Sequence, residues 1–154
     1  FLGLHFVVQN FIKVLIMSSI DYQLGYSIYS ANNFVSKEYK KILKKLGITY
    51  PQYLVLCVLW ENDNVMVSQI AKKLKLDTPT ITPILKRLEN SGFVARLRDK
   101  YDERKVLVTL TKKSFSIKEE SINSEKKILK KICLDNTKLN KLVVTLNEIR
   151  NKLS

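Results

Sequence analysis

The 154-residue sequence has few of the residues from which metal-binding, disulfide-linked or catalytic sites are usually built. Its two cysteines, Cys57 and Cys133, give no disulfide framework and fit a reduced, cytoplasmic location. Its one histidine, His5, argues against a histidine-based metal site, and four glycines leave little material for phosphate-cradling loops. No G-x-x-x-x-G-K-S/T, G-x-G-x-x-G, H-E-x-x-H or G-x-S-x-G motif occurs. The sequence therefore predicts no enzyme, no metal site and no cofactor.

What the chain has instead is an excess of positive charge. It carries 27 Lys and Arg against 14 Asp and Glu, a formal net charge of +13. Such an excess is typical of proteins that bind a polyanion. A lysine bias that only aids solubility explains the total equally well, so the positions of the cations must decide. Apolar residues make up 45% of the chain, which suits one domain with a hydrophobic core.

Residues 1–16 form an unusually apolar segment at the start of the chain. It is shorter than the about 20 residues that span a bilayer, and it lacks the features of a signal peptide, so no membrane partner is expected. Met17 resembles a natural start, which favours the interpretation that residues 1–16 are extra or non-native sequence. The alternative is a helix that packs on a partner subunit. Residues 17–154 are expected to form a single domain.

Long helices are predicted on both sides of the middle of the chain. Helical spacing of apolar residues predicts one helix over residues 20–46 and another over 51–61. The second is apolar on nearly all sides, so it is expected at the buried centre. Residues 112–153 are also helical by pattern, with a break near residues 135–136.

Shorter elements are predicted between these helices. Residues 65–67 suit a small strand, and Ser68 is expected to cap a helix over residues 69–74. After a tight turn, a second helix starts at Thr78-Pro79, capped by Thr78 or Asp77, and ends near Gly92. Two strand-like runs, 93–98 and 106–110, then form a hairpin around a charged loop.

Helix, tight turn, helix and hairpin is the order of a winged helix-turn-helix. The predicted fold class is therefore mainly α with a small β-hairpin wing (α+β). The DNA-binding region is expected within residues 49–111, and helices in residues 20–48 and 112–154 flank it.

In a winged helix-turn-helix, the second helix enters the major groove with its N-terminal residues near base edges. Here that end carries Thr78, Thr80 and Thr82, whose hydroxyl and methyl groups can contact bases. Lys86 and Arg87 follow on the side of the helix away from its apolar residues. These five residues are predicted to bind DNA; the alternative is a helix cap and a solvated face.

The hairpin carries a cluster of cations that a purely structural hairpin does not need. Like charges so close together repel each other, whereas a wing that lies over phosphates and the minor groove uses them. The predicted DNA contacts are Arg96, Arg98, Lys100, Arg104 and Lys105. Asp102 could hold the Arg104 guanidinium in place. A simple basic turn is the alternative.

Several segments resemble the MarR family of transcriptional regulators. Asp102-Glu103-Arg104, followed after five residues by Leu110-Thr111, resembles the family's D-x-R-x-x-x-x-x-L-T wing signature. Residues 76–89, which include the unusual Pro83, resemble its recognition-helix motif. Residues 49–61 resemble a narrower branch, the organic-hydroperoxide-resistance regulators and their staphylococcal redox-regulator relatives. The resemblance is dense over residues 20–111 and loose in the C-terminal helices.

The resemblance implies a homodimer in which the first and last helices interleave between subunits. Apolar stripes along the terminal helices fit that use, and packing within one chain is the alternative. A two-fold dimer would bind a palindromic operator in double-stranded DNA, with half-sites about one helical turn apart.

The resemblance also implies a sensor that this sequence lacks in part. In the hydroperoxide-sensing branch, tyrosines contact a reactive cysteine in the first helix. Tyr29, Tyr39 and Tyr50 match those tyrosines, but Gly25 stands at the cysteine position. Glycine has no thiol to oxidise. Cys133 matches the rough position of a second, resolving cysteine in some members.

These observations predict a homodimeric, sequence-specific DNA-binding regulator, a repressor of stress or organic hydroperoxide response genes. Its effector would be an organic hydroperoxide or another small molecule. Two alternatives stay open: a MarR-type regulator that responds to a non-redox ligand, and an architectural protein with low sequence specificity. Gly25 fits either a natural loss of the thiol or an engineered replacement.

Overall fold

The computed structural model describes residues 19–98, 106–132 and 134–153, which fall into two compact units divided between Glu38 and Tyr39. The 3-10 turn η1 (Ile20–Tyr22) lies in the first unit and precedes helix α2 (Leu24–Leu43), which begins in the first unit and ends in the second. One continuous helix over residues 20–46 was expected, and this is wrong at both ends. Gln23 is extended (φ −77°, ψ 121°) and separates η1 from α2. At the other end, a second 3-10 turn, η2 (Lys44–Leu46), replaces the last α-helical turn.

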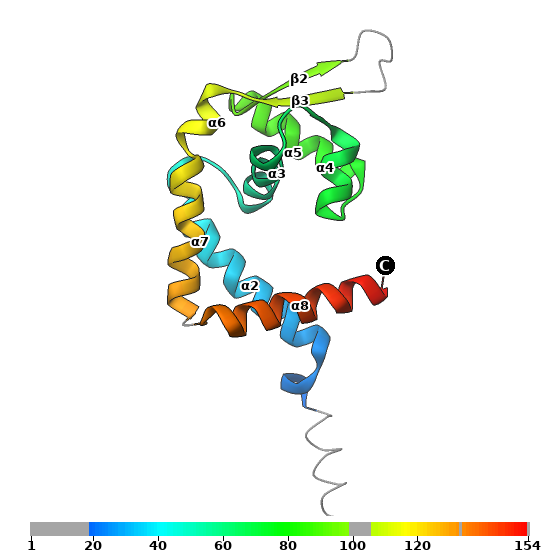
Figure 1. Cartoon of the computed structure of the whole chain (residues 1–154), viewed down its shortest axis with the longest axis vertical. Helices are drawn as coiled ribbons and strands as arrows, with labels where there is room; N and C mark the ends of the chain where they lie inside the picture. The colour runs from blue at the N-terminus through cyan, green and yellow to red at the C-terminus, as the bar shows by residue number, and fades with distance from the viewer. Residues whose placement is uncertain (1–18, 99–105, 133, 154) are drawn as a thin grey trace, which may run out of the picture. The chain divides into compact units, whose positions relative to one another are not determined.

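The second unit contains the predicted order of helix, turn, helix and hairpin, which confirms the winged helix-turn-helix (Figure 1). Its elements after η2 are α3 (Tyr50–Glu61), β1 (Val65–Met66), α4 (Val67–Leu74), α5 (Thr78–Asn90), β2 (Val94–Arg98), β3 (Val106–Leu110), α6 (Lys112–Ser116), α7 (Lys118–Ile132) and α8 (Asn136–Leu153).

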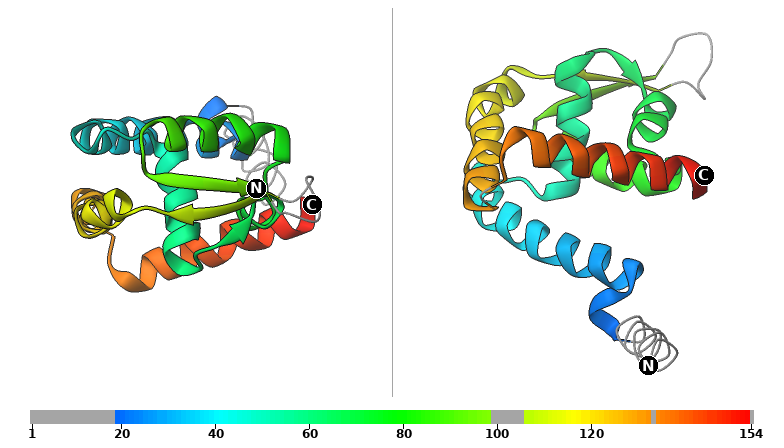
Figure 2. Two further views of the ribbon diagram at one scale, coloured as in Figure 1. Left: turned by 90° about the horizontal axis from the view of Figure 1, so that it is seen from above. Right: turned by 60° about the horizontal axis from the view of Figure 1, so that its bottom comes forward.

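A three-stranded antiparallel sheet joins the hairpin to the helix-turn-helix. The strand order is β1-β3-β2, so β3 is central. Strands β2 and β3 run side by side in Figure 2 and pair over five residues, from Val94 opposite Leu110 to Arg98 opposite Val106. Strand β1 leads directly into α4 and pairs with β3 through Val65 and Met66. The wing is thus hydrogen-bonded to the segment that begins the helix-turn-helix.

Helix α3 lies at the centre of this unit, as its composition predicted. It contacts α4, α5 and β3, and its Val55, Leu56 and Leu59 are at most 1% exposed. Three residues of α5, Ile81, Leu85 and Leu88, are completely buried. Removal of this apolar surface from water stabilises the fold and sets which side of α5 faces outward.

Two predicted boundaries near these elements are wrong. Ser68 does not cap α4, because the helix already begins at Val67 with Met66 as its N-cap residue. The Gln69 side chain accepts a hydrogen bond from the Met66 backbone N–H at 2.8 Å, which stabilises this earlier start. The C-terminal region breaks at Ile117 as well as before Asn136, so it forms three helices where two were expected.

No single helix in the described ranges is long and apolar enough to cross a bilayer. The segments Leu24–Leu46 and Tyr50–Glu61 pass that test jointly, as a bent pair, by length and composition.

Candidate nucleic-acid interface

The exposed N-terminus of α5 is the first part of the candidate interface. Asp77 is the N-cap residue, and its carboxylate accepts a hydrogen bond from the Thr80 backbone N–H at 3.2 Å. A hydrogen bond with the Thr80 side chain, helped by this backbone bond, holds the pKa of the Asp77 carboxyl below its usual range. Of the two predicted caps, Asp77 therefore has that role, and Thr78 begins the helix. Thr78 and Thr80 are exposed on the first turn.

The third threonine of this end is placed differently. Thr82 is half-buried, and its hydroxyl donates to the Thr78 backbone carbonyl at 2.8 Å. The hydroxyl hydrogen is thereby committed to the helix, so the oxygen lone pairs and the methyl group are what Thr82 can offer a base.

Further along α5, Lys86 and Arg87 are both exposed. They lie between the fully buried Leu85 and Leu88, so one side of the helix anchors it and the other presents cations. The predicted orientation of this helix is confirmed. An exposed cationic side next to an exposed N-terminus matches what a phosphate backbone and the adjacent groove require.

The two predicted wing cations of β2 have different surroundings. Arg98 is exposed at the end of the strand. Arg96 is half-buried, and its Nε donates to a Glu89 carboxylate oxygen of α5 at 2.7 Å. The Arg96 guanidinium holds the pKa of the Glu89 carboxyl below its usual range. The remaining wing residues of the prediction, Lys100, Asp102, Arg104 and Lys105, lie outside the described residues.

A hollow of about 320 Å³ lies where α4, α5 and the sheet meet. Thr78, Thr82 and Arg96 all line it, together with apolar side chains that include Leu85 and Val106. The structure thus brings together three predicted DNA-binding residues that are up to 18 positions apart in sequence, from 78 to 96.

The predicted sensor residues fall in both units. Gly25 and Tyr29 lie on α2 in the first unit, where Tyr29 is 65% exposed. A Cβ atom at Gly25 would meet nothing within 4 Å. Tyr39 and Tyr50 belong to the second unit, and their ring centroids are 4.4 Å apart. Cys133 lies outside the described residues.

Tyr53 joins Tyr39 and Tyr50 to form what we call the tyrosine cluster. Its ring centroid lies 5.9 Å from that of Tyr39 and 6.2 Å from that of Tyr50. The Tyr39 hydroxyl donates to Glu125 Oε2 of α7 at 2.7 Å. Burial raises the pKa of all three tyrosines, and the Glu125 carboxylate raises it further. Two sequence-matched tyrosines are therefore packed together in one chain.

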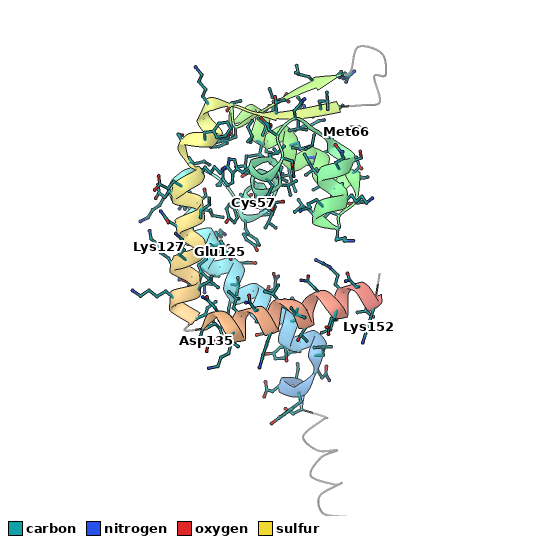
Figure 3. All side chains as sticks on the ribbon, in the orientation of Figure 1. Cys57, Met66, Glu125, Lys127, Asp135 and Lys152 are labelled. Carbon is teal, nitrogen blue, oxygen red and sulfur yellow. The ribbon has the colours of Figure 1, made fainter. Side chains whose placement is uncertain are left out.

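Glu125, Tyr53 and Cys57 were not predicted for this region. Figure 3 shows Glu125 on α7 and Cys57 on α3. Burial raises the pKa of the Cys57 thiol, although a hydrogen bond with Tyr53 partly opposes that shift. No feature of the sequence marks Glu125 as part of this cluster, but in the structure it lies four residues after Ser121 and three before Ile128, both buried. That spacing puts Glu125 at the inward edge of α7.

Among the described residues, no group of three or more His, Cys, Asp or Glu side chains is arranged to hold a metal ion.

Comparison with known proteins identifies relatives of this arrangement. A family model described as "Transcriptional regulator SarA/Rot" matches residues 37–121. The organic hydroperoxide resistance transcriptional regulator of Bacillus subtilis (strain 168) is 41% identical over 104 residues, which cover 68% of this chain and 71% of that protein. The HTH-type transcriptional regulator MgrA of Staphylococcus aureus is 41% identical over 107 residues, which cover 69% and 73%.

Among solved structures, reduced AbfR bound to DNA is similar, with a TM-score of 0.75 and 35% identity. The match covers 85% of this chain and 90% of that chain. AbfR, from Staphylococcus epidermidis, has also been solved in an overoxidized DNA-bound form and in a disulfide form.

Proposed function

The chain belongs to the SarA/Rot type of MarR-family winged-helix transcriptional regulators, and from this membership we propose that it is a dimeric repressor of stress or organic hydroperoxide response genes. Members of this family are DNA-binding regulators rather than enzymes. The observation that carries the proposal is the outward side of α5. Its exposed first turn, with Thr78 and Thr80, adjoins a side that carries Lys86 and Arg87.

In the proposal, one set of residues contacts base edges and another set attracts the phosphates of the DNA backbone. Thr78 and Thr80 lie where base edges are contacted in this motif, so they supply specificity. Lys86, Arg87 and Arg98 supply attraction to phosphates, which is independent of sequence. The predicted wing residues Arg104 and Lys105 extend this attraction in the proposal.

MarR-type proteins are dimers, and the apolar surface of this chain supports the same state here. Helix α8 has no buried residue, even though it carries several apolar side chains. Four of these are at least 41% exposed: Leu142, Val143, Val144 and Leu146. On α2, Phe34 is 69% exposed. If a second copy covers these side chains, their burial would stabilise the dimer by about 25 cal/mol per Å² of apolar surface removed from water. Sedimentation velocity across a concentration series tests this state.

Operator binding is tested by selecting bound sequences from random duplexes, followed by competition at fixed salt. The selected duplex should bind roughly 10³-fold or more tightly than a scrambled duplex. Lys86→Ala and Arg87→Ala should each reduce the dependence of log Kd on log salt by about 1.8, because each substitution removes one phosphate contact of about 0.9 from both subunits of the dimer. Lys127→Ala on α7 removes an equal charge outside the helix-turn-helix and should leave that slope unchanged. Near-equal binding of both duplexes would instead identify an architectural protein.

The signal that releases DNA is the second part of the proposal. The B. subtilis relative is named for organic hydroperoxide resistance, and AbfR has several oxidation states. In this chain Gly25 provides no thiol at the position expected from the resemblance. That observation favours a second candidate, in which a non-redox small molecule is the effector.

Gly25→Cys separates the two effector classes. The substitution fits the single chain because the position has free space for a Cβ atom. With Gly25→Ala as the matched control, organic hydroperoxide should release operator DNA from the cysteine variant alone if the rest of the redox site is intact. Release from the unmodified chain would point to Cys133 or Cys57. Retention of DNA by all three proteins would support the non-redox ligand.

A further inference from the structure

Arg96 has a more specific role than the cluster of wing cations suggests. We infer that Arg96 and Glu89 form a bracket that positions the wing against α5, and that Arg96 is a positioning residue and not a phosphate contact. The inference rests on the proposed DNA-binding function and deepens it. The side chains come from different elements, because Glu89 lies near the end of α5 and Arg96 is the central residue of β2.

The bracket consists of three hydrogen bonds on one carboxylate. Glu89 Oε1 accepts from the Arg96 backbone N–H at 3.2 Å. Glu89 Oε2 accepts from Arg96 Nε at 2.7 Å and from Nη2 at 2.5 Å. Both the backbone and the side chain of Arg96 are therefore held by the same residue. One carboxylate oxygen accepts from the guanidinium and the other from the backbone of the same residue, so the orientation of the carboxylate is fixed as well as its distance, which a single contact does not achieve.

The backbone contact places Glu89 at the edge of the sheet. Strand β2 is an edge strand, because β3 separates it from β1. The Arg96 N–H donates to Glu89, so it points away from β3 and toward the free edge of β2. Edge N–H groups need a partner, and here a side chain of α5 supplies it. The helix is thus joined to the strand at a point where the sheet itself offers no bond.

The environment of the pair strengthens it and limits other uses of Arg96. The side chains of Arg96 and Glu89 are 24% and 32% exposed, so water competes with the ion pair less than at an open surface. The bracket occupies Nε and Nη2, and a phosphate would have to compete with a carboxylate that is already in place. Arg98, two residues further along β2, is exposed and is held by no carboxylate among the described residues, so in the proposal it supplies attraction to phosphate.

The geometry gives the bracket an effect on the wing. Residues two apart in a strand lie on the same face, so the orientation of Arg98 follows that of Arg96. Glu89 lies 11 residues after Thr78, about 16 Å along the helix at 1.5 Å per residue. The bracket therefore sets the direction in which the β2–β3 hairpin leaves the far end of α5, while the N-terminus of α5 is left free to read bases.

Glu89→Gln and Arg96→Gln distinguish positioning from phosphate contact, because the two roles predict different changes in DNA affinity for Glu89→Gln. A positioning pair predicts that both variants bind the selected duplex at least about 5-fold more weakly, with an unchanged salt slope. The double variant should be no weaker than either single variant, because the residues act as a unit. A phosphate contact predicts instead that Arg96→Gln lowers the salt slope by about 1.8, which is about 0.9 for each subunit of the dimer. In that case Glu89→Gln, which removes a negative charge and frees Arg96, binds equally well or more tightly.

Hydroxyl-radical footprinting at saturating protein separates positioning of the wing from a general loss of stability. The bracket variants should lose hydroxyl-radical protection of the sugars along the minor groove beside the recognition site. They should keep protection of guanine N7 in the major groove against methylation by dimethyl sulfate, which reports the contacts that hydroxyl radicals do not. Uniform loss of both, or full retention of both, would overturn the inference. Glu89→Gln preserves size and one acceptor, so it should fold normally, as circular dichroism will verify. If the unmodified chain selects no duplex, the proposed function is overturned, and the bracket with it. If the unmodified chain selects a duplex normally but Glu89→Gln binds that duplex equally well or more tightly, the bracket alone is overturned.

Discussion

The hydrogen bond from Tyr39 to Glu125 should make a measurable contribution to the free energy of unfolding, and Tyr39→Phe isolates that contribution. The substitution removes only the hydroxyl, which donates to Glu125 Oε2 at 2.7 Å, and it keeps the ring that stacks on Tyr53. A hydrogen bond to a charged group contributes roughly 1.5–3 kcal/mol. Tyr39 is only 5% exposed, but Glu125 is an exposed residue whose carboxylate can regain water. We therefore expect a loss of about 1–2 kcal/mol in the free energy of unfolding.

Urea unfolding measures this loss through the single tryptophan, Trp60, whose ring lies edge-on to Tyr53 at 6.3 Å between centroids. Protein concentration must be held constant, since the stability of a dimer depends on it. The urea dependence of the free energy, the m-value, should not change. Tyr22→Phe is the matched control, because Tyr22 is 67% exposed and its hydroxyl should contribute little.

A double-mutant cycle with Glu125→Ala completes the test. If the bond exists as described, the cost of Tyr39→Phe should nearly vanish in the Glu125→Ala background. Additive losses, or a Tyr39→Phe variant as stable as the unmodified chain, would refute the reasoning.

Three further predictions concern pH and packing. Burial raises the pKa of the tyrosine hydroxyls in the cluster, so they lose their protons at lower pH in the unfolded chain than in the folded one. The free energy of unfolding should therefore fall as pH rises above about 10, the ordinary tyrosine value. Absorbance at 295 nm, followed during alkaline unfolding, should show that these tyrosines ionise only at higher pH than exposed ones. The Glu89 carboxyl has a lowered pKa, so its contribution is complete above the ordinary glutamate value of about 4.3 and is lost as pH falls further. Acid titration of stability should therefore be flatter below pH 4 in Glu89→Gln than in the unmodified chain. Leu85→Ala should cost about 2–5 kcal/mol by urea unfolding, because Leu85 is completely buried between α5 and its neighbours.

Features that depend on neighbouring residues could be read from the sequence. The limits of α5 follow from Asp77, which caps its first turn, and from Gly92, whose φ of +74° suits glycine after a helix. The burial of α3 could also be predicted from its own residues, because a helix that is apolar on nearly all sides is stable only where other elements cover it. Near Ser68 the local signal failed, because the Gln69 side chain stabilises an earlier start of α4.

Features that join distant residues could not be read in this way. The Tyr39–Glu125 bond spans 86 positions, and helix periodicity gives no indication of which partner a buried hydroxyl selects. Arg96 was grouped with the free cations because a count of charges along a hairpin does not reveal that Glu89 of α5 occupies its guanidinium. Both cases need the packing of one element against another, which only the assembled fold provides.

The pairing of β1 with β3 has a consequence for how operators change in evolution. Since β3 pairs both with β2 of the hairpin and with β1, the strand that leads into α4, the wing and the helix-turn-helix form one hydrogen-bonded module. If the chain binds an operator as a dimer, as proposed, substitutions on the surface of that module would alter which half-site is chosen. The separation between half-sites would then depend on the helices outside the module, so recognition sequence and operator spacing would be able to change independently.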